Sequence, residues 1–195
     1  MNPPLCIDLF CGYGGWARGF LDAGFRVIGF DNERRCATRY PGEFIVADVR
    51  TLSGGKFHRA KIIVASPPCN RFTTVATRTR DPEEGLILVR HAMRIIKEAN
   101  PEYWVIENVR GAFTAINREL GMRPLNAPLH KNGSCYLWGT IPSGAILPRI
   151  VKGWRRDRNA PPSMWTGSKQ APHRDSRMNS RIAYPLARAL AEACI

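Results

Sequence analysis

The feature that most constrains the fold is a series of short apolar runs, separated by helical or irregular stretches. The runs are short and rich in branched and aromatic residues, which favours strands over helices. They cover residues 5–10, 26–30, 43–47, 61–65 and 103–106. Strands that alternate with helices form parallel sheets. The order therefore predicts an α/β fold with a mainly parallel central sheet and helices on both faces.

Helical patterns fill several of the intervals between these runs. They predict helices over residues 11–23, 86–99, 112–120 and 182–195, and residues 136–139 predict a further strand on the far half of the sheet. The apolar stripe of the second helix consists of Leu86, Val89, Ala92, Met93 and Ile96. Residues 73–85 are polar and lack a period, so we expect a mobile loop that closes over a substrate.

A glycine-rich turn follows the first predicted strand. Gly12, Gly14 and Gly15 lie between that strand and a helix, where glycine lets the backbone approach a ligand closely. Asp31 ends the second strand and is placed to accept hydrogen bonds from ribose hydroxyls, although a helix-capping role fits equally well. Asp48 follows the third strand and is a candidate for an adenine amino group, or simply a turn residue. Together these strand ends predict an adenosine-bearing cofactor. A Walker-type phosphate loop is missing, which disfavours a nucleoside triphosphate.

Two prolines and a cysteine follow the strand at residues 61–65. Pro67 and Pro68 stiffen the turn that presents Cys69 at the carboxyl end of the strand, where ligands bind in open α/β sheets. Cys69 is therefore a candidate nucleophile; the alternative is a small buried apolar residue. Glu107 ends the strand at residues 103–106 beside an apolar wall, so it is a candidate for a raised pKa, or else a solvated turn residue.

The balance of charge indicates an acidic partner. The chain has 29 Lys and Arg against 16 Asp and Glu, a net charge of +13, and nucleic acid is the first expectation. Arg71, Arg78 and Arg80 follow Cys69 and suit phosphates. Residues 149–181 combine basic side chains with tryptophans available for stacking. The alternatives are charge that serves solubility and a loosely structured solvated arm.

Length and cysteine usage narrow the class further. A chain of 195 residues suits one globular domain. The six cysteines are scattered without a Cys-x-x-Cys pair, so we expect neither a zinc site nor a disulfide framework. We expect neither a signal peptide nor a transmembrane segment, and hence a cytoplasmic protein with reduced thiols.

These motifs, in this order, resemble the cytosine-C5 DNA methyltransferases that use S-adenosylmethionine. The resemblance covers most of residues 4–139 and returns at the final helix, and it implies a single Rossmann-like methyltransferase domain. It implies cofactor contacts by Asp8, Phe10, Gly12, Gly14, Gly15, Asp31, Asp48 and Pro67. It identifies Pro67-Pro68-Cys69 with the catalytic Pro-Cys motif and Glu107-Asn108-Val109 with the Glu-Asn-Val motif.

The implied activity is transfer of a methyl group to C5 of cytosine in double-stranded DNA. The Cys69 thiolate would attack C6 of a base flipped out of the helix. A protonated Glu107 near N3 would offset the charge that develops on the ring, and Asn108 would fix its loop. The residues themselves leave open an RNA cytosine-C5 methyltransferase, a catalytically impaired nucleic-acid binder, and transfer of another one-carbon group.

The sequence also departs from the family pattern. Asn70 stands where the family usually has Gln, and the stretch 130–139 lacks the arginines of a Gln-x-Arg-x-Arg motif, so Lys131 is the candidate replacement. We divide the chain into a catalytic core (1–148), a reduced target-recognition segment (149–181) and a C-terminal helix that packs back on the core (182–195). The expected DNA contacts are Arg71, Arg78, Arg80, Lys131, Lys152, Arg155, Arg156 and Arg158. We expect a monomer of the small, solitary or phage-like type, with a short or broad target specificity.

Overall fold

A six-stranded sheet in the order β3-β2-β1-β4-β5-β6 forms the centre of the protein. The computed structural model describes residues 2–73, 80–125, 136–148, 182 and 184–195. The strands are β1 (Leu5–Leu9), β2 (Arg26–Asp31), β3 (Glu43–Val46), β4 (Ala60–Ala65), β5 (Tyr103–Asn108) and β6 (Tyr136–Thr140). All pairings from β3 to β5 are parallel and β6 runs antiparallel to β5. This Rossmann-like order confirms the predicted α/β fold.

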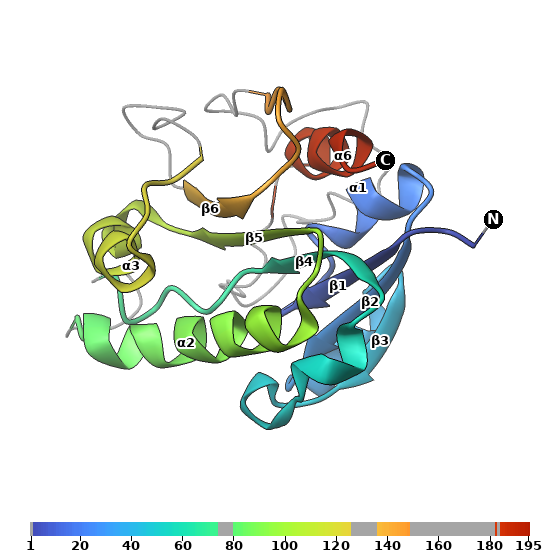
Figure 1. Ribbon diagram of the computed structural model, residues 1–195. Coiled ribbons are helices and arrows are strands. Elements are labelled where there is room, and N and C mark those ends of the chain that lie inside the picture. The colour runs from blue at the N-terminus through green and yellow to red at the C-terminus, as the bar shows by residue number, and fades with distance from the viewer. Residues whose placement is uncertain (1, 74–79, 126–135, 149–181, 183) are drawn as a thin grey trace, which may run out of the picture.

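Helices cover both faces of the sheet (Figure 1). On one face lie α1 (Ala17–Asp22) and α6 (Tyr184–Ala193), and on the other lie α2 (Pro82–Ala99) and α3 (Phe113–Leu120). Short 3-10 helices connect the elements: η1 (Arg34–Thr38), η2 (Val49–Thr51), η3 (Gly54–Phe57) and η4 (Arg110–Ala112). Side chains alternate along each strand. Ile7 and Leu9 of β1 therefore pack in the core between the sheet and α2, whereas Cys6 packs in the core between the sheet and α6.

Helix α2 begins at Pro82 rather than at residue 86, so the predicted polar loop is wrong for its last four residues. The Asp81 side chain accepts a hydrogen bond from the Glu84 amide, at 3.0 Å, and caps the helix. Pro82 then occupies the first turn with two acidic residues, which favour the positive end of the helix dipole. The buried face includes Ile95 and Ala99 besides the predicted stripe, in which Met93 is only partly buried.

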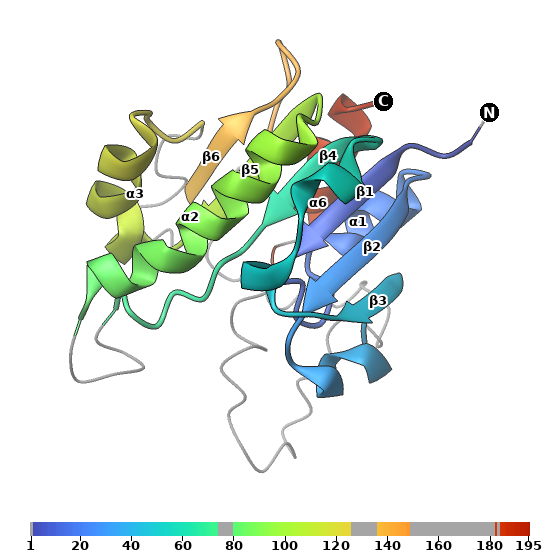
Figure 2. The same ribbon diagram turned by 60° about the horizontal axis from the view of Figure 1, so that its bottom comes forward.

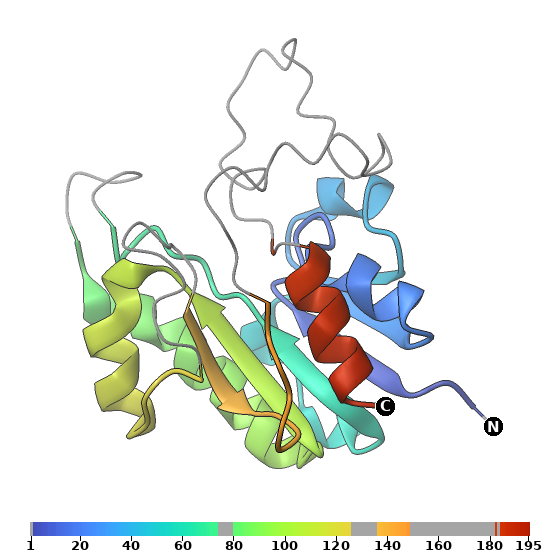
Figure 3. The same ribbon diagram turned by 90° about the horizontal axis from the view of Figure 1, so that it is seen from above.

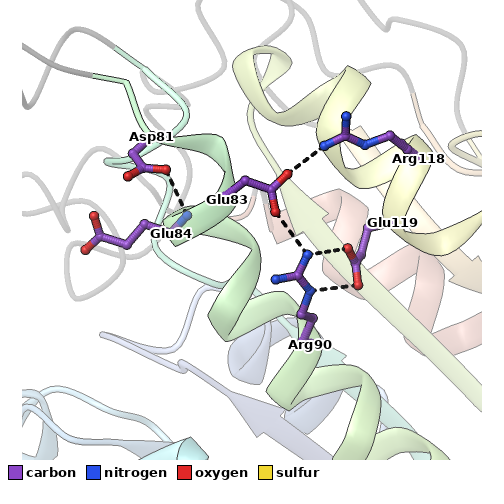
Figure 4. Close-up of polar contacts among 6 residues, drawn as sticks. All are labelled: Asp81, Glu83, Glu84, Arg90, Arg118 and Glu119. Atoms are coloured by element: carbon purple, nitrogen blue, oxygen red, sulfur yellow. Dashed lines mark hydrogen bonds and ion pairs between the residues drawn. The ribbon is translucent and has the colours of Figure 1, made fainter.

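Ion pairs on the surface join the first half of α2 to α3 (Figure 4). Arg90 pairs with Glu83 on its own helix and with Glu119 of α3, and Arg118 of α3 also pairs with Glu83. This network joins the start of α2 to α3 at the surface, where exposed ion pairs contribute about 0–1 kcal/mol each.

The last helix lies directly on the first (Figure 3). A Cβ atom built on Gly19 of α1 would lie 2.6 Å from Cβ of Ala187 in α6, so only glycine permits this close approach. The Tyr184 hydroxyl and the Arg188 guanidinium both donate to Asp22 at the end of α1. Within the described ranges, no helix is long and apolar enough to span a bilayer.

Candidate active site

The carboxyl ends of the parallel strands meet at one edge of the sheet (Figure 2). Leu9 of β1 pairs in register with Ala65 of β4, and Ala65 pairs with Ile106 of β5. The turn after β4 and the end of β5 are therefore neighbours. The Ser66 amide donates to the Leu9 carbonyl at 3.2 Å, which extends the ladder one residue into the turn.

The turn that presents Cys69 is held by side chains from two other elements. Asn108, at the end of β5, is buried; its Nδ2 donates to the Pro67 carbonyl at 3.0 Å and its Oδ1 accepts from the Val109 amide. From the other side, Nε1 of Trp16 donates to Oγ of Ser66 at 3.0 Å. These contacts hold the turn between the end of β5 and the start of α1.

Cys69 lies at the accessible end of this turn. Pro67 is buried, Pro68 is exposed and Cys69 is partly buried. Burial raises the pKa of the Cys69 thiol above its usual value, and the negative charge of nearby Glu107 raises it further. The structure thus brings together Cys69 and Glu107, which are far apart in the sequence.

The glycine-rich loop after β1 has the backbone geometry that its sequence requires. Gly12 has a φ of 50° and Gly14 a φ of 84°, a region that favours glycine, and Phe10 also adopts a positive φ of 56°. A Cβ atom built on Gly12 would meet nothing within 4 Å, so the space beside this turn is open within the described residues. Gly15 is partly buried.

Asp31 links the loop to the segment after β2. Its Oδ2 accepts from the Gly12 amide at 3.0 Å, and its Oδ1 accepts from the Glu33 amide at 2.9 Å, just before η1. Asp31 thus caps the turn before η1 and not the helix itself, whose N-cap residue is Glu33, so the helix-capping alternative is wrong. Because each carboxylate oxygen has a second lone pair, Asp31 can still accept a ligand hydroxyl.

Asp48 is engaged within its own turn. It accepts from the Arg50 amide, which caps η2, and forms an ion pair with the Arg50 guanidinium. The hydrogen bonds from Arg50 lower the pKa of Asp48. A ligand amino group at Asp48 would have to share the carboxylate with Arg50.

Asp8 has an environment that its motif did not predict. It is buried, its Oδ2 accepts from the Tyr40 hydroxyl at 3.0 Å, and its Oδ1 has no hydrogen-bond partner among the described residues. Burial raises the pKa of Asp8 to about 8; the Tyr40 hydrogen bond lowers it, and the charge of Asp31 adds to the increase. Tyr40 was absent from the predicted site. Its signal was Gly29, a glycine inside a strand, which marks close approach of another group.

Two of the predicted DNA-binding arginines can be placed. Arg71 pairs with Glu84 at 2.9 Å, and Nη2 of Arg80 donates to the Gly111 carbonyl at 3.0 Å. The Asp81 amide donates to the Arg71 carbonyl at 3.0 Å. The other predicted contacts lie outside the described residues: Arg78, Lys131, Lys152, Arg155, Arg156 and Arg158.

The sequence profile of the C-5 cytosine-specific DNA methylases matches residues 5–127. The chain belongs to this family. The match begins with β1, includes the glycine-rich loop and Cys69, and extends beyond α3, so it contains each motif that the carboxyl edge brings together.

Individual relatives agree with the family profile. The chain is 31% identical over 133 residues to the type II methyltransferase M.XorII of Xanthomonas oryzae pv. oryzae, a match that covers 61% of this chain and 31% of that protein. It is 33% identical over 118 residues to the type II methyltransferase M.HgiGI of Herpetosiphon aurantiacus, covering 54% of this chain and 90% of that one. The chain thus spans under a third of M.XorII and most of M.HgiGI.

A solved structure shares the fold. A candidate DNA modification methyltransferase encoded within an E. coli prophage superimposes with a TM-score of 0.54 and 21% identity, over 76% of this chain and 52% of that one. The similarity shows a shared α/β fold, in agreement with the strand order.

Proposed function

We propose that this protein transfers a methyl group from S-adenosylmethionine to C5 of cytosine in DNA, through a covalent bond between Cys69 and C6 of a flipped base. The observation that supports this most is the junction of β4 and β5, where Asn108 joins the Cys69 turn to β5, in which Glu107 is the last residue but one. A nucleophile and a carboxyl group on neighbouring strand ends suit addition to one face of a ring.

The glycine-rich loop suits S-adenosylmethionine, the methyl donor that the family implies. The open space at Gly12, the Asp31 carboxylate and the unpartnered Oδ1 of Asp8 lie in or beside one loop. When bound, S-adenosylmethionine supplies an electrophilic methyl group. We assign Asp8, Phe10, Gly12, Gly14, Gly15, Asp31, Asp48 and Pro67 to its binding.

Cys69 supplies the nucleophile. Because burial and Glu107 raise its pKa, the thiol is protonated in the free protein and must lose its proton before it attacks. Protonation of Glu107 removes one of the two causes of that increase. A neutral Glu107 therefore favours the Cys69 thiolate as well as a hydrogen bond to the substrate.

The addition and elimination steps use the same two side chains. Sulfur of Cys69 forms a bond to C6, the C5–C6 double bond opens, and Glu107 donates its proton to N3, which neutralises the charge on the ring. C5 is then nucleophilic enough to accept a methyl group. Loss of the C5 proton to a water molecule restores the double bond and expels Cys69 as a thiolate, and N3 returns its proton to Glu107. Asn108 and Pro68 keep the sulfur in line through the cycle.

We assign double-stranded DNA as the partner and a monomer as the acting form, in the cytoplasm of a bacterial, archaeal or phage-infected cell. The net charge of +13 suits a phosphate backbone. Extrusion of one cytosine costs a few kcal/mol, and contacts by Arg71, Arg80 and the predicted basic residues would offset it.

A fluorinated substrate tests this function directly. Fluorine at C5 of cytosine cannot leave as a proton, so the enzyme stays bound through Cys69 after methyl transfer. We expect a DNA–protein adduct on a denaturing gel that requires S-adenosylmethionine and maps to Cys69.

Cys69→Ser is the matched variant, and Cys36→Ser, at a buried thiol in η1, is the control. We expect the adduct to vanish in the first and persist in the second. An adduct formed with fluorinated RNA and not with DNA would replace DNA by RNA as substrate. Tight binding of DNA and cofactor without any adduct would refute the covalent mechanism.

A further inference from the structure

We propose that Tyr40 is a positioning residue for the glycine-rich loop. Its ring packs against Gly14 of the loop and Gly29 of β2, and its hydroxyl donates a hydrogen bond to Asp8 of β1. The inference rests on the proposed binding of S-adenosylmethionine at this loop. It assigns to Tyr40 a role that the sequence motifs do not contain.

The missing side chain of Gly29 in β2 leaves room for Tyr40 to reach Asp8. Gly29 pairs in register with Asp8. A Cβ atom built on Gly29 would lie 2.3 Å from Cζ of Tyr40 and 2.5 Å from its hydroxyl oxygen. The tyrosine ring therefore lies where the side chain of a larger residue would be, and its hydroxyl donates to Oδ2 of Asp8 at 3.0 Å.

Residues 39–41 also pack against the glycine-rich loop. A Cβ atom built on Gly14 would lie 2.4 Å from Cδ of Pro41 and 3.2 Å from Cδ2 of Tyr40, so both rings press against the loop backbone. The Arg39 guanidinium lies over the Tyr13 ring, 5.2 Å from its centroid. Three consecutive residues thus contact the loop at Tyr13 and Gly14, and the middle one is anchored to the central strand through Asp8.

The hydrogen bond from Tyr40 also affects the protonation of the Asp8 carboxyl group, which lies next to the loop. The groups that face the Asp8 carboxyl are the Tyr40 hydroxyl, the Asp31 carboxylate and the thiols of Cys6 and Cys11. Among these, the Tyr40 hydroxyl stabilises the ionised form and lowers the pKa of Asp8, whereas the negative charge of Asp31 raises it. Ionised Asp8 would attract the ammonium group of the cofactor, so affinity should rise as Asp8 loses its proton.

Tyr40→Phe removes the hydroxyl and keeps the ring. We would titrate S-adenosylhomocysteine into the protein by calorimetry between about pH 6 and about pH 8.5, an interval that contains the raised pKa of Asp8, about 8. For the wild type we expect affinity to increase with pH. In the variant we expect affinity to fall about five- to tenfold, the effect of losing one hydrogen bond, and the rise with pH to flatten over this interval.

Tyr184→Phe is the matched control, because it removes another hydrogen bond from a tyrosine hydroxyl to an aspartate, Asp22, at the far end of α1. It should leave both the affinity and the pH profile unchanged. A second variant, Pro41→Ala, removes packing under Gly14 and keeps the hydroxyl. We expect it to weaken binding without changing the pH profile.

A Tyr40→Phe variant that is less stable but keeps the wild-type affinity and pH profile would overturn the inference. If Tyr40→Phe does not fold, unaltered binding by Pro41→Ala would overturn it. If the wild type itself does not bind S-adenosylhomocysteine, the proposed function fails and the inference fails with it. Wild-type binding without an effect of Tyr40→Phe refutes the inference alone.

Discussion

Replacing Asp8 by asparagine tests whether its buried carboxyl group is neutral in the folded protein. The pKa of Asp8 is raised from 3.8 to about 8, with burial as the main cause. Asparagine has nearly the same shape, stays neutral at every pH and can accept the Tyr40 hydrogen bond through its own oxygen. The substitution therefore removes a titration and leaves the packing in place.

The raised pKa determines the sign of the effect. The folded protein keeps a proton on Asp8 between about pH 4 and about pH 8, where the unfolded chain has already lost it. The stability that protonation of Asp8 contributes is thus complete below the unfolded pKa and is lost as the pH rises through the folded pKa. At about 1.4 kcal/mol per pH unit, the wild type should lose about 2 kcal/mol relative to Asp8→Asn between about pH 6 and about pH 8.

Urea unfolding of both proteins at the two pH values measures this difference. Titrating groups far from Asp8 are common to both proteins, so their contributions cancel in the comparison, whereas the interactions of Asp8 with Asp31, Cys6 and Cys11 are part of the measured difference. Parallel stability curves for the wild type and Asp8→Asn would refute the argument that Asp8 is protonated in the fold. A wild type that gains stability over the variant as the pH rises would reverse its sign.

Three further substitutions test the contacts that hold the site. Asn108→Ala leaves the Pro67 carbonyl without its donor and should destabilise the fold by about 1–3 kcal/mol in urea unfolding, with the covalent DNA adduct lost before cofactor binding is. Gly29→Ala places a methyl group against the Tyr40 ring and should cost about 1–3 kcal/mol, whereas Tyr40→Leu in the same background should recover part of the loss. Arg90→Met should lower the melting temperature slightly at low salt and leave it unchanged at high salt, since the guanidinium is exposed; an equal loss at both would point to packing instead.

The sheet and its edge were predictable because their signals are local and periodic. The apolar runs before the glycine-rich loop, Asp31 and Cys69 became β1, β2 and β4 with shifts of one residue at their ends. Once these strands are parallel, their polar ends must meet, which is why Cys69 and Glu107 were both expected at one edge.

Contacts made across the sheet could not be predicted in the same way. Tyr40 lies between η1 and β3, where the sequence has no period, and its partner Asp8 is in another strand. Asp48 looked available for a ligand because its sequence context shows a strand end but not the pairing with Arg50. The start of α2 has a different explanation: Asp81-Pro82-Glu83-Glu84 is a helix-capping signal, but it is as polar as a loop, so composition alone does not distinguish the two.

Because α6 packs against Gly19 of α1, the first helix gains its partner only late in synthesis of the protein. Asp22 and Arg188 are 166 residues apart in sequence, so the apolar face of α1 stays uncovered until nearly the whole chain described here has left the ribosome. Contacts of such long range slow folding. A nascent chain interrupted before α6 would expose the apolar side chains of α1 that α6 covers in the complete fold, and such exposed apolar surface favours aggregation.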